Sequence, residues 1–124
     1  MADLIYPELS YELIGILFEV DNQIGYGHRE LLYQVAISKL LKENKIDFQE
    51  QLKCQINIGN QPVKRYFLDF LIEKKLILEI KAGDRFYREN IAQVYDYLKA
   101  NNLKLGIIAN FTKHGVKFKR IIYK

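Results

Sequence analysis

Two neighbouring apolar segments, each interrupted by one carboxylate, constrain this fold more than any other feature of the sequence. The first segment covers residues 66–72 and contains Asp69, and the second covers residues 76–80 and contains Glu79. Segments that are apolar on both faces are typical of central strands covered by helices. Because burying a lone carboxylate is unfavourable, each of these acids needs a cation, hydrogen-bond donors or a shifted pKa.

The polar segment 73–75 predicts a tight reversal between the two strands. A three-residue loop sets Ile72 opposite Leu76 and Asp69 opposite Glu79, and opposed side chains in such a pair lie roughly 5 Å apart. Two like charges at that distance repel unless something positive lies between them. A divalent metal is one solution, because Mg²⁺ takes hard oxygen ligands and keeps several waters.

Lys81 follows Glu79 by two residues, so its side chain is expected on the same side of the strand. It could hold or polarise a water near the metal. An ordinary cross-strand cluster, in which Lys81 only neutralises Asp69 and Glu79, is the alternative that these residues leave open.

The other segments predict one mixed sheet with helices on its faces, in the order α-α-β-β-β-α-β-β. A strand, helix, strand series implies a right-handed crossover to a parallel neighbour. We expect helices over about residues 8–23, 28–44 and 87–101, and further strands over about 48–58, 103–111 and 118–123. The expected buried stripes are Leu13, Leu17, Val20 and Ile24 in the first helix, Leu32, Val35, Ala36, Lys39 and Leu40 in the second, and Ile91, Val94, Tyr95 and Leu98 in the third.

The charge of the chain is unevenly distributed. The 124 residues suffice for a single domain, 1–124, with a net charge of +4. Residues 1–50 hold nine acidic and four basic side chains, whereas residues 51–124 hold six acidic and fifteen basic ones. A basic half suits a polyanion such as nucleic acid. The candidate phosphate contacts near the end of the chain are Lys117, Lys119 and Arg120, although a solvated basic surface is the plainer alternative.

Three sequence features bear on the compartment. Cys54 is the single cysteine, so no internal disulfide can form, which fits a reducing, cytoplasmic setting. No run of 18 apolar residues predicts a membrane span. The N-terminal stretch lacks a basic region followed by an apolar core, so we expect no secretory signal.

Several motifs, in the right order, resemble a known family. Asp69 followed by Glu79-Ile80-Lys81 resembles the bipartite signature of the PD-(D/E)xK nuclease superfamily. The segment from Gln93 to Tyr97 reads Gln-x-x-x-Tyr and is similar to the helical motif of the RecB-like branch of that superfamily.

Upstream, Gly27, Glu30 and Tyr33 form the Gly-x-x-Glu-x-x-Tyr motif that names a small family within the superfamily. Segments 66–69, 97–99 and 106–111 also resemble later blocks of that family. The resemblance covers roughly residues 10–123 and implies a restriction-endonuclease-like mixed sheet.

The resemblance implies roles for the matching residues. Asp69 and Glu79 would bind metal, together with the backbone carbonyl of Ile80, and Lys81 would position the attacking water. The implied cofactor is Mg²⁺ or Mn²⁺.

Further roles follow from the same resemblance. Glu30 would be an additional acid that reaches the site, while Gln93 and Tyr97 would orient the site or a phosphate. Tyr33 is expected to pack in the core under the site. Many relatives carry a His shortly before the Gln, where this chain has Asn90, so no histidine base is implied.

The expected function is therefore a metal-dependent phosphodiesterase that acts on DNA or RNA, with DNA favoured. The alternative is a module that keeps the fold for nucleic-acid or protein binding without catalysis, because a fold does not guarantee a function. The sequence leaves the substrate form and the oligomeric state, including a homodimer, open.

Overall fold

The computed structural model describes residues 5–124 and has the predicted order of elements. Residues 1–4, which belong to the N-terminal stretch considered above for a secretory signal, lie outside the described range. The elements are α1 (Pro7–Ile24), α2 (Glu30–Glu43), β1 (Phe48–Ile58), β2 (Gln61–Ile72), β3 (Leu76–Ala82), α3 (Arg88–Asn101), β4 (Leu105–Thr112) and β5 (Gly115–Ile122). This order confirms the predicted α/β fold.

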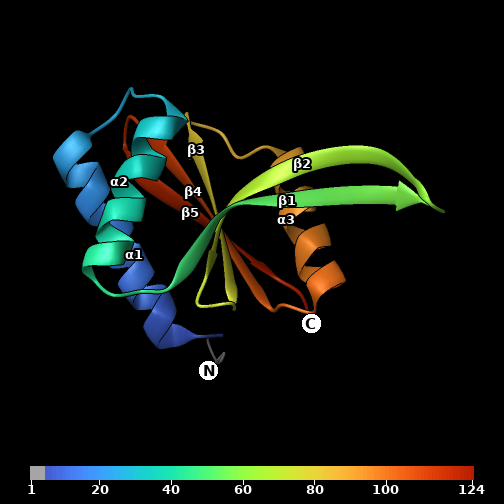
Figure 1. Ribbon diagram of the computed structural model, residues 1–124. Coiled ribbons are helices and arrows are strands. Elements are labelled where there is room, and N and C mark those ends of the chain that lie inside the picture. The colour runs from blue at the N-terminus through green and yellow to red at the C-terminus, as the bar shows by residue number, and fades with distance from the viewer. Residues whose placement is uncertain (1–4) are drawn as a thin grey trace.

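One five-stranded sheet, in the order β1-β2-β3-β4-β5, forms the centre of the molecule. All neighbours are antiparallel except β3 and β4, which run parallel because α3 carries the chain back between them. The predicted helical connection to a parallel neighbour is thus confirmed. Helices α1 and α2 lie on one side of the sheet and α3 lies on the other (Figure 1).

Strand β3 packs on both faces, which explains its continuous apolar sequence. Leu76, Leu78 and Ile80 belong to the buried cluster under α1 and α2. Ile77 belongs to the cluster under α3, together with Val94 and Leu98 of that helix. A strand covered on both sides has no solvent face on which polar residues would be favoured.

The buried face of α1 is the predicted one, whereas that of α2 is predicted only in part, since Ala36 and Leu40 pack against the core. Leu32 and Val35 of α2 are 43% and 58% exposed, and the buried residues are Tyr33, Ile37, Ser38 and Leu41. Tyr33 is the reason for this orientation: its ring stacks on Phe111 of β4 at a centroid distance of 4.1 Å. Burying this large ring removes more apolar area from water than burying Val35 would.

In α3, the predicted stripe is correct except at one position. Val94 and Leu98 are buried and Ile91 is half-buried. Tyr95 is 40% exposed and instead contacts Tyr123 edge to face, at a centroid distance of 5.7 Å. Tyr95 therefore lies at the border of the helix interface.

Gly106 lets α3 lie close to β4. A Cβ atom at this position would lie 2.4 Å from Cγ1 of Val94, closer than real contacts allow. We expect Gly106→Ala to lower the free energy of unfolding by about 1–3 kcal/mol through overpacking. Gly15 in α1 is the matched control: a Cβ there meets nothing within 4 Å, so Gly15→Ala should stabilise by roughly 0.5–1 kcal/mol. Urea unfolding of both variants measures the difference, and a loss of similar size in both would contradict the close packing.

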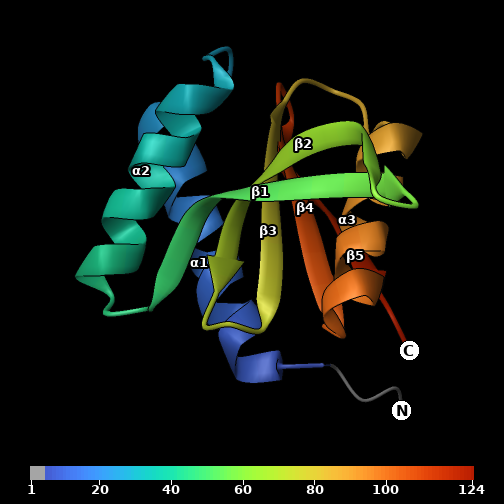
Figure 2. The same cartoon turned by 45° about the vertical axis from the view of Figure 1, so that its right-hand side comes forward.

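Strands β1 and β2 form a long hairpin that extends beyond the sheet and crosses in front of β3 and β4 (Figure 2). The far half of the hairpin leaves the main core. Alternation along residues 52–58 predicts Ile56 and Ile58 on the same side as Cys54, but they are 37% and 73% exposed, whereas Cys54 is buried. Residues 59–62 read as a turn in the sequence, but the turn is shorter, because β2 already begins at Gln61.

At Asp69, the side chains of β2 change the face of the sheet toward which they point. Phe70 and Ile72 belong to the cluster under α1 and α2, whereas Leu68, of the same parity, belongs to the cluster under α3. Gln51, which stands opposite Asp69 in the register of β1 and β2, has a left-handed backbone with φ of 53°. The strands therefore bend sharply at the position of the predicted metal ligand.

Candidate active site

The ladder between β2 and β3 ends where the candidate site begins. Ile72 pairs with Leu76, as predicted, and the pairing continues as far as Phe70 with Leu78. The next position in this register sets Asp69 opposite Glu79, but β2 bends away there.

Side chains replace the backbone pairs at this point. The backbone N–H of Asp69 donates to Oε1 of Glu79 at 3.0 Å, and the backbone N–H of Ile80 donates to Oδ2 of Asp69 at 2.7 Å. Each carboxylate is thus held by the other strand, and both are fixed at the end of the ladder. These bonds leave the second oxygen of each carboxylate for another ligand.

Glu79 is the buried acid of the site, with 4% of its surface exposed. Burial, and then the charge of Asp69, raise the pKa of Glu79 to about 8, although Lys81 acts in the opposite direction. The ionised pair is therefore unfavourable in the protein alone. A positive ligand between the two carboxylates would favour the charged form.

Lys81 of β3 connects Glu79 of the sheet with helix α2. Its Nζ lies 3.6 Å from Oε2 of Glu79 and 3.9 Å from Oε1 of Glu30, and about a quarter of its side chain is exposed. Glu30 is the first residue of α2. The structure thus brings four of the predicted residues, Asp69, Glu79, Lys81 and Glu30, into one cluster.

Tyr33 explains how the loop before α2 presents Glu30. Its hydroxyl donates to the carbonyl of Gly25 at 2.7 Å and accepts the backbone N–H of His28 at 3.3 Å. The ring is fully buried, which confirms the expected core position. Gly27 within this loop has φ of 97°, a conformation that favours glycine. The Gly-x-x-Glu-x-x-Tyr motif is therefore a device that fixes the start of α2 beside the site.

The donor set of the site fits a hard divalent metal. Asp69 and Glu79 offer two carboxylates, and Mg²⁺ is commonly held by one or two carboxylates while it keeps several waters. Within residues 5–124, no group of three or more His, Cys, Asp or Glu side chains is arranged to hold a metal. The fit is therefore to a mostly hydrated ion rather than to a closed protein cage.

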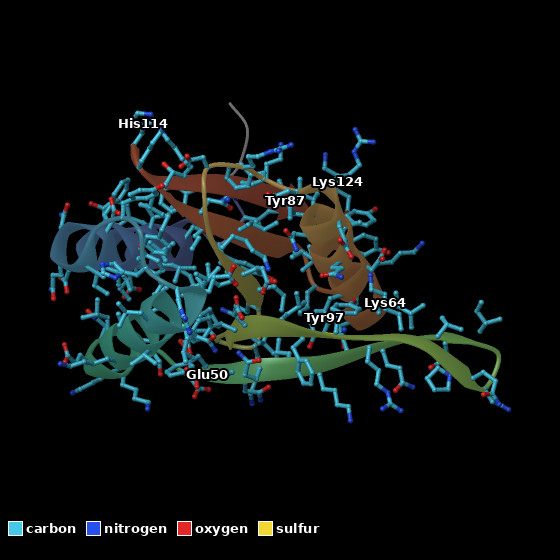
Figure 3. All side chains as sticks on the ribbon, turned by 90° about the horizontal axis from the view of Figure 1, so that it is seen from above. Glu50, Lys64, Tyr87, Tyr97, His114 and Lys124 are labelled. Carbon is cyan, nitrogen blue, oxygen red and sulfur yellow. The ribbon has the colours of Figure 1, made fainter. Side chains whose placement is uncertain are left out.

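Gln93 and Tyr97 lie on the part of α3 that the hairpin covers. The backbone carbonyl of Gln93 accepts the hydroxyl of Tyr66 at 3.4 Å. Tyr97 is half-buried against the cluster under α3, and burial raises its pKa. Tyr97 lies between the hairpin and α3 (Figure 3), so this part of the helix supports the strand that carries Asp69.

The three basic candidates of β5 lie on two sides of the sheet. Lys117 and Lys119 pair with Asn110 and Ile108 of β4 and so share the side covered by α3. Arg120 points to the other side, where its Nη1 lies 3.5 Å from the hydroxyl of Ser10 in α1. Lys117 is therefore separated from Arg120, although both are close in sequence.

Lys117 lies in the same row as Lys81. Lys81 pairs with Asn110 across β3 and β4, and Asn110 pairs with Lys117 across β4 and β5. Two strand spacings separate the two lysines, about 10 Å. The row extends positive charge from the site along the carboxyl end of β4.

Asn110 is a polar residue of the site region that the sequence reasoning missed. It is 1% exposed, and its Nδ2 donates to the carbonyls of Gly83 and Arg85. These bonds hold the loop that leads from Lys81 to α3. Among the buried side-chain nitrogen and oxygen atoms of residues 5–124, its Oδ1 is the one without a hydrogen-bond partner. A lone amide in an apolar strand is the same signal that identified Asp69 and Glu79.

Comparison with known proteins gives a family and a similar fold. The PD-(D/E)XK nuclease superfamily matches residues 7–121. A solved structure, "Crystal structure of SSO0001", is similar with a TM-score of 0.54 and 19% sequence identity, over 94% of this chain and 57% of that chain. This chain thus spans little more than half of that protein, and the likeness concerns the fold alone. No curated protein matches the chain.

The mixed sheet, with an acid on β2 and an acid-x-Lys segment on β3, defines a nuclease-like α/β domain. The chain belongs to the PD-(D/E)XK nuclease superfamily, because the match covers nearly all of it. None of the helices in residues 5–124 is long and apolar enough to cross a membrane.

Proposed function

We propose that this protein is a metal-dependent nuclease that cleaves phosphodiester bonds, with Asp69, Glu79 and Lys81 as its catalytic residues. The main support is the reciprocal hydrogen bonding that fixes both carboxylates at the end of the β2–β3 ladder. The Lys81 ammonium lies 3.6 Å from Glu79. The Lys81 ammonium, and a cation held by the two carboxylates, would stabilise the negative charge that develops on the phosphate without reorganisation.

A bound Mg²⁺ or Mn²⁺ would supply Lewis acidity to the phosphate and a lower pKa to its bound water. Asp69, Glu79 and the carbonyl of Ile80 would hold this ion. Lys81 would hold the attacking water or a phosphate oxygen, because its side chain is partly exposed and its ammonium group lies beside Glu79. Glu30 would fix Lys81 from the opposite side, at 3.9 Å.

We also propose that, within the superfamily, this protein belongs to the family named after the Gly-x-x-Glu-x-x-Tyr motif. Its support is the way Tyr33 holds the loop that presents Glu30, so that all three motif residues have a physical role. We further propose a cytoplasmic protein, because the free Cys54 suits a reducing compartment.

We propose DNA as the substrate, with Lys81 and Lys117 positioned to contact its phosphates whatever the base sequence. The test incubates the protein with single-stranded, nicked and branched DNA and with RNA, in Mg²⁺, Mn²⁺ or EDTA. Cleavage that needs the metal supports the proposal. Binding without cleavage in any metal would favour the non-catalytic module.

The salt dependence of DNA binding tests whether the lysines of β5 contact phosphates. Replacing Lys117 and Lys119 together with Ala should flatten the slope of log affinity against log salt by up to about 2 units, since each phosphate contact contributes nearly one. Arg120→Ala is the control within the same strand, because Arg120 faces α1. Anisotropy titrations at several salt concentrations give the slopes. Equal slopes for the double variant and wild type would remove β5 from the interface.

A further inference from the structure

An exposed aromatic ring lies on the hairpin strand that carries Asp69. Phe67 of β2 is 55% exposed, although the sequence predicted a covered strand here. It precedes Asp69 by two residues, about 7 Å along the strand, and lies beyond the bend, where Leu68 and Tyr66 face α3. An exposed ring at this position has no role in the core.

Unpaired positive charge surrounds this ring. Lys53 stands directly opposite Phe67 on β1, and Arg65 lies two residues before it on the same side of β2. Neither takes part in an ion pair among residues 5–124. Lys64, on the other side of the strand, is already bound to Glu89 of α3 at 3.2 Å. The cations on the side of Phe67 therefore remain free for a polyanion.

The other side of the hairpin keeps this surface in place. Cys54 and Leu68 pack into the cluster under α3, with Tyr66 partly buried against it. The hydroxyl of Tyr66 also donates to the carbonyl of Gln93. Because these contacts occupy the inner face, the face with Lys53, Arg65 and Phe67 is the outer one, and it is held against a helix instead of moving freely. Figure 3 shows side chains projecting outward from this hairpin.

We infer that the face formed by Lys53, Arg65 and Phe67 binds an unpaired nucleic-acid strand, with one base stacked on Phe67. This inference rests on the proposed nuclease function and names its substrate class. Duplex bases already stack on both sides, so an exposed ring favours a base that is unpaired. The two cations contact the phosphates on either side of that base.

The test measures binding of a labelled 20-nucleotide single strand and of its blunt duplex to the full chain in EDTA, where metal-dependent cleavage cannot occur. Phe67→Ala should weaken single-strand binding by about 5–100-fold, the usual range for one stacked base, and leave duplex binding nearly unchanged. Phe67→Tyr should retain the wild-type affinity because it keeps the ring. Tyr11→Ala, which removes an even more exposed ring from α1, is the control.

Charge variants complete the design. Arg65→Ala should lower the salt slope for the single strand by about 0.7, and its neighbour Lys64→Ala should leave the slope unchanged. Equal losses on both DNA forms, or none, in Phe67→Ala overturn the inference and leave the nuclease proposal intact. If wild type binds no nucleic acid at all, both fail. A dimer in light scattering that Phe67→Ala converts to monomer assigns this face to a second copy instead, which also overturns the inference.

Discussion

Replacing Lys81 with Met is expected to reduce phosphodiester cleavage by about 10²–10⁴-fold, the usual contribution of one positioned catalytic group. The reason is local. Nζ of Lys81 lies 3.6 Å from Glu79 and the side chain is partly exposed, so it can reach a water or a phosphate oxygen beside Glu79. Met keeps the length and apolar stem of the side chain and removes only the charge. Binding of DNA should stay close to that of wild type, because Lys81 supplies one charge among many.

Lys99→Met is the matched control, since Lys99 lies in the last turn of α3 and is exposed. Cleavage is followed with a labelled substrate in Mg²⁺, and binding by anisotropy in EDTA. Thermal melting of each variant shows that a loss of cleavage does not come from unfolding. Wild-type cleavage rates in Lys81→Met would contradict the assigned role.

The stability of the metal-free protein is expected to fall as the pH rises from about 5 to 8. Glu79 has an ordinary pKa near 4.5 in the unfolded chain and a pKa of about 8 in the fold, where burial and Asp69 oppose its charge. Between these values the native state holds a proton that the unfolded state has lost. Raising the pH therefore favours the unfolded state, by on the order of 2–4 kcal/mol over this window.

Glu79→Gln should remove most of this slope, because Gln resembles the protonated acid and its oxygen can still accept the N–H of Asp69. Near pH 8 and in EDTA, the variant should be more stable than wild type. Glu43→Gln, an exposed acid at the end of α2, should keep the wild-type slope. Urea unfolding at pH 5.5 and 8.5 measures all three proteins. Parallel pH profiles of stability for wild type and Glu79→Gln would show that ionisation of Glu79 does not oppose folding.

Local chemistry made the centre of the fold predictable. The segment 73–75 allows only a tight reversal, so it fixes the register of β2 and β3 as far as Phe70 and Leu78 and brings Asp69 and Glu79 together at the end of the ladder. The crossover from β3 through α3 to β4 followed from the order of elements. These features depend on short stretches of sequence, and the structure agrees with them.

Features that depend on contacts between distant segments were not predictable. The orientation of α2 is set by Tyr33 stacking on Phe111, residues that are far apart in the chain. The bend of the hairpin at Asp69 accompanies a left-handed Gln51, for which the sequence has no glycine signal. Because of that bend, Phe67 becomes exposed in a segment that reads as fully buried.

The candidate site shows the same division. The acids and Lys81 were visible as charged residues in apolar strands, and Asn110 carried the same signal but was passed over. The group Lys117, Lys119 and Arg120 looked like one surface because the residues are adjacent. Alternation along β5 sends Arg120 to Ser10 on the opposite side of the sheet, which charge counting alone could not reveal.

The most direct measurement is calorimetric titration of Mn²⁺ into wild type, Asp69→Asn and Lys81→Met at pH 8. The account predicts that wild type binds the metal, that Asp69→Asn loses this binding with its fold intact, and that Lys81→Met retains it, because Lys81 acts on water or phosphate and not on the ion. Equal Mn²⁺ affinity in wild type and Asp69→Asn would contradict the metal site between Asp69 and Glu79, and with it the proposed chemistry.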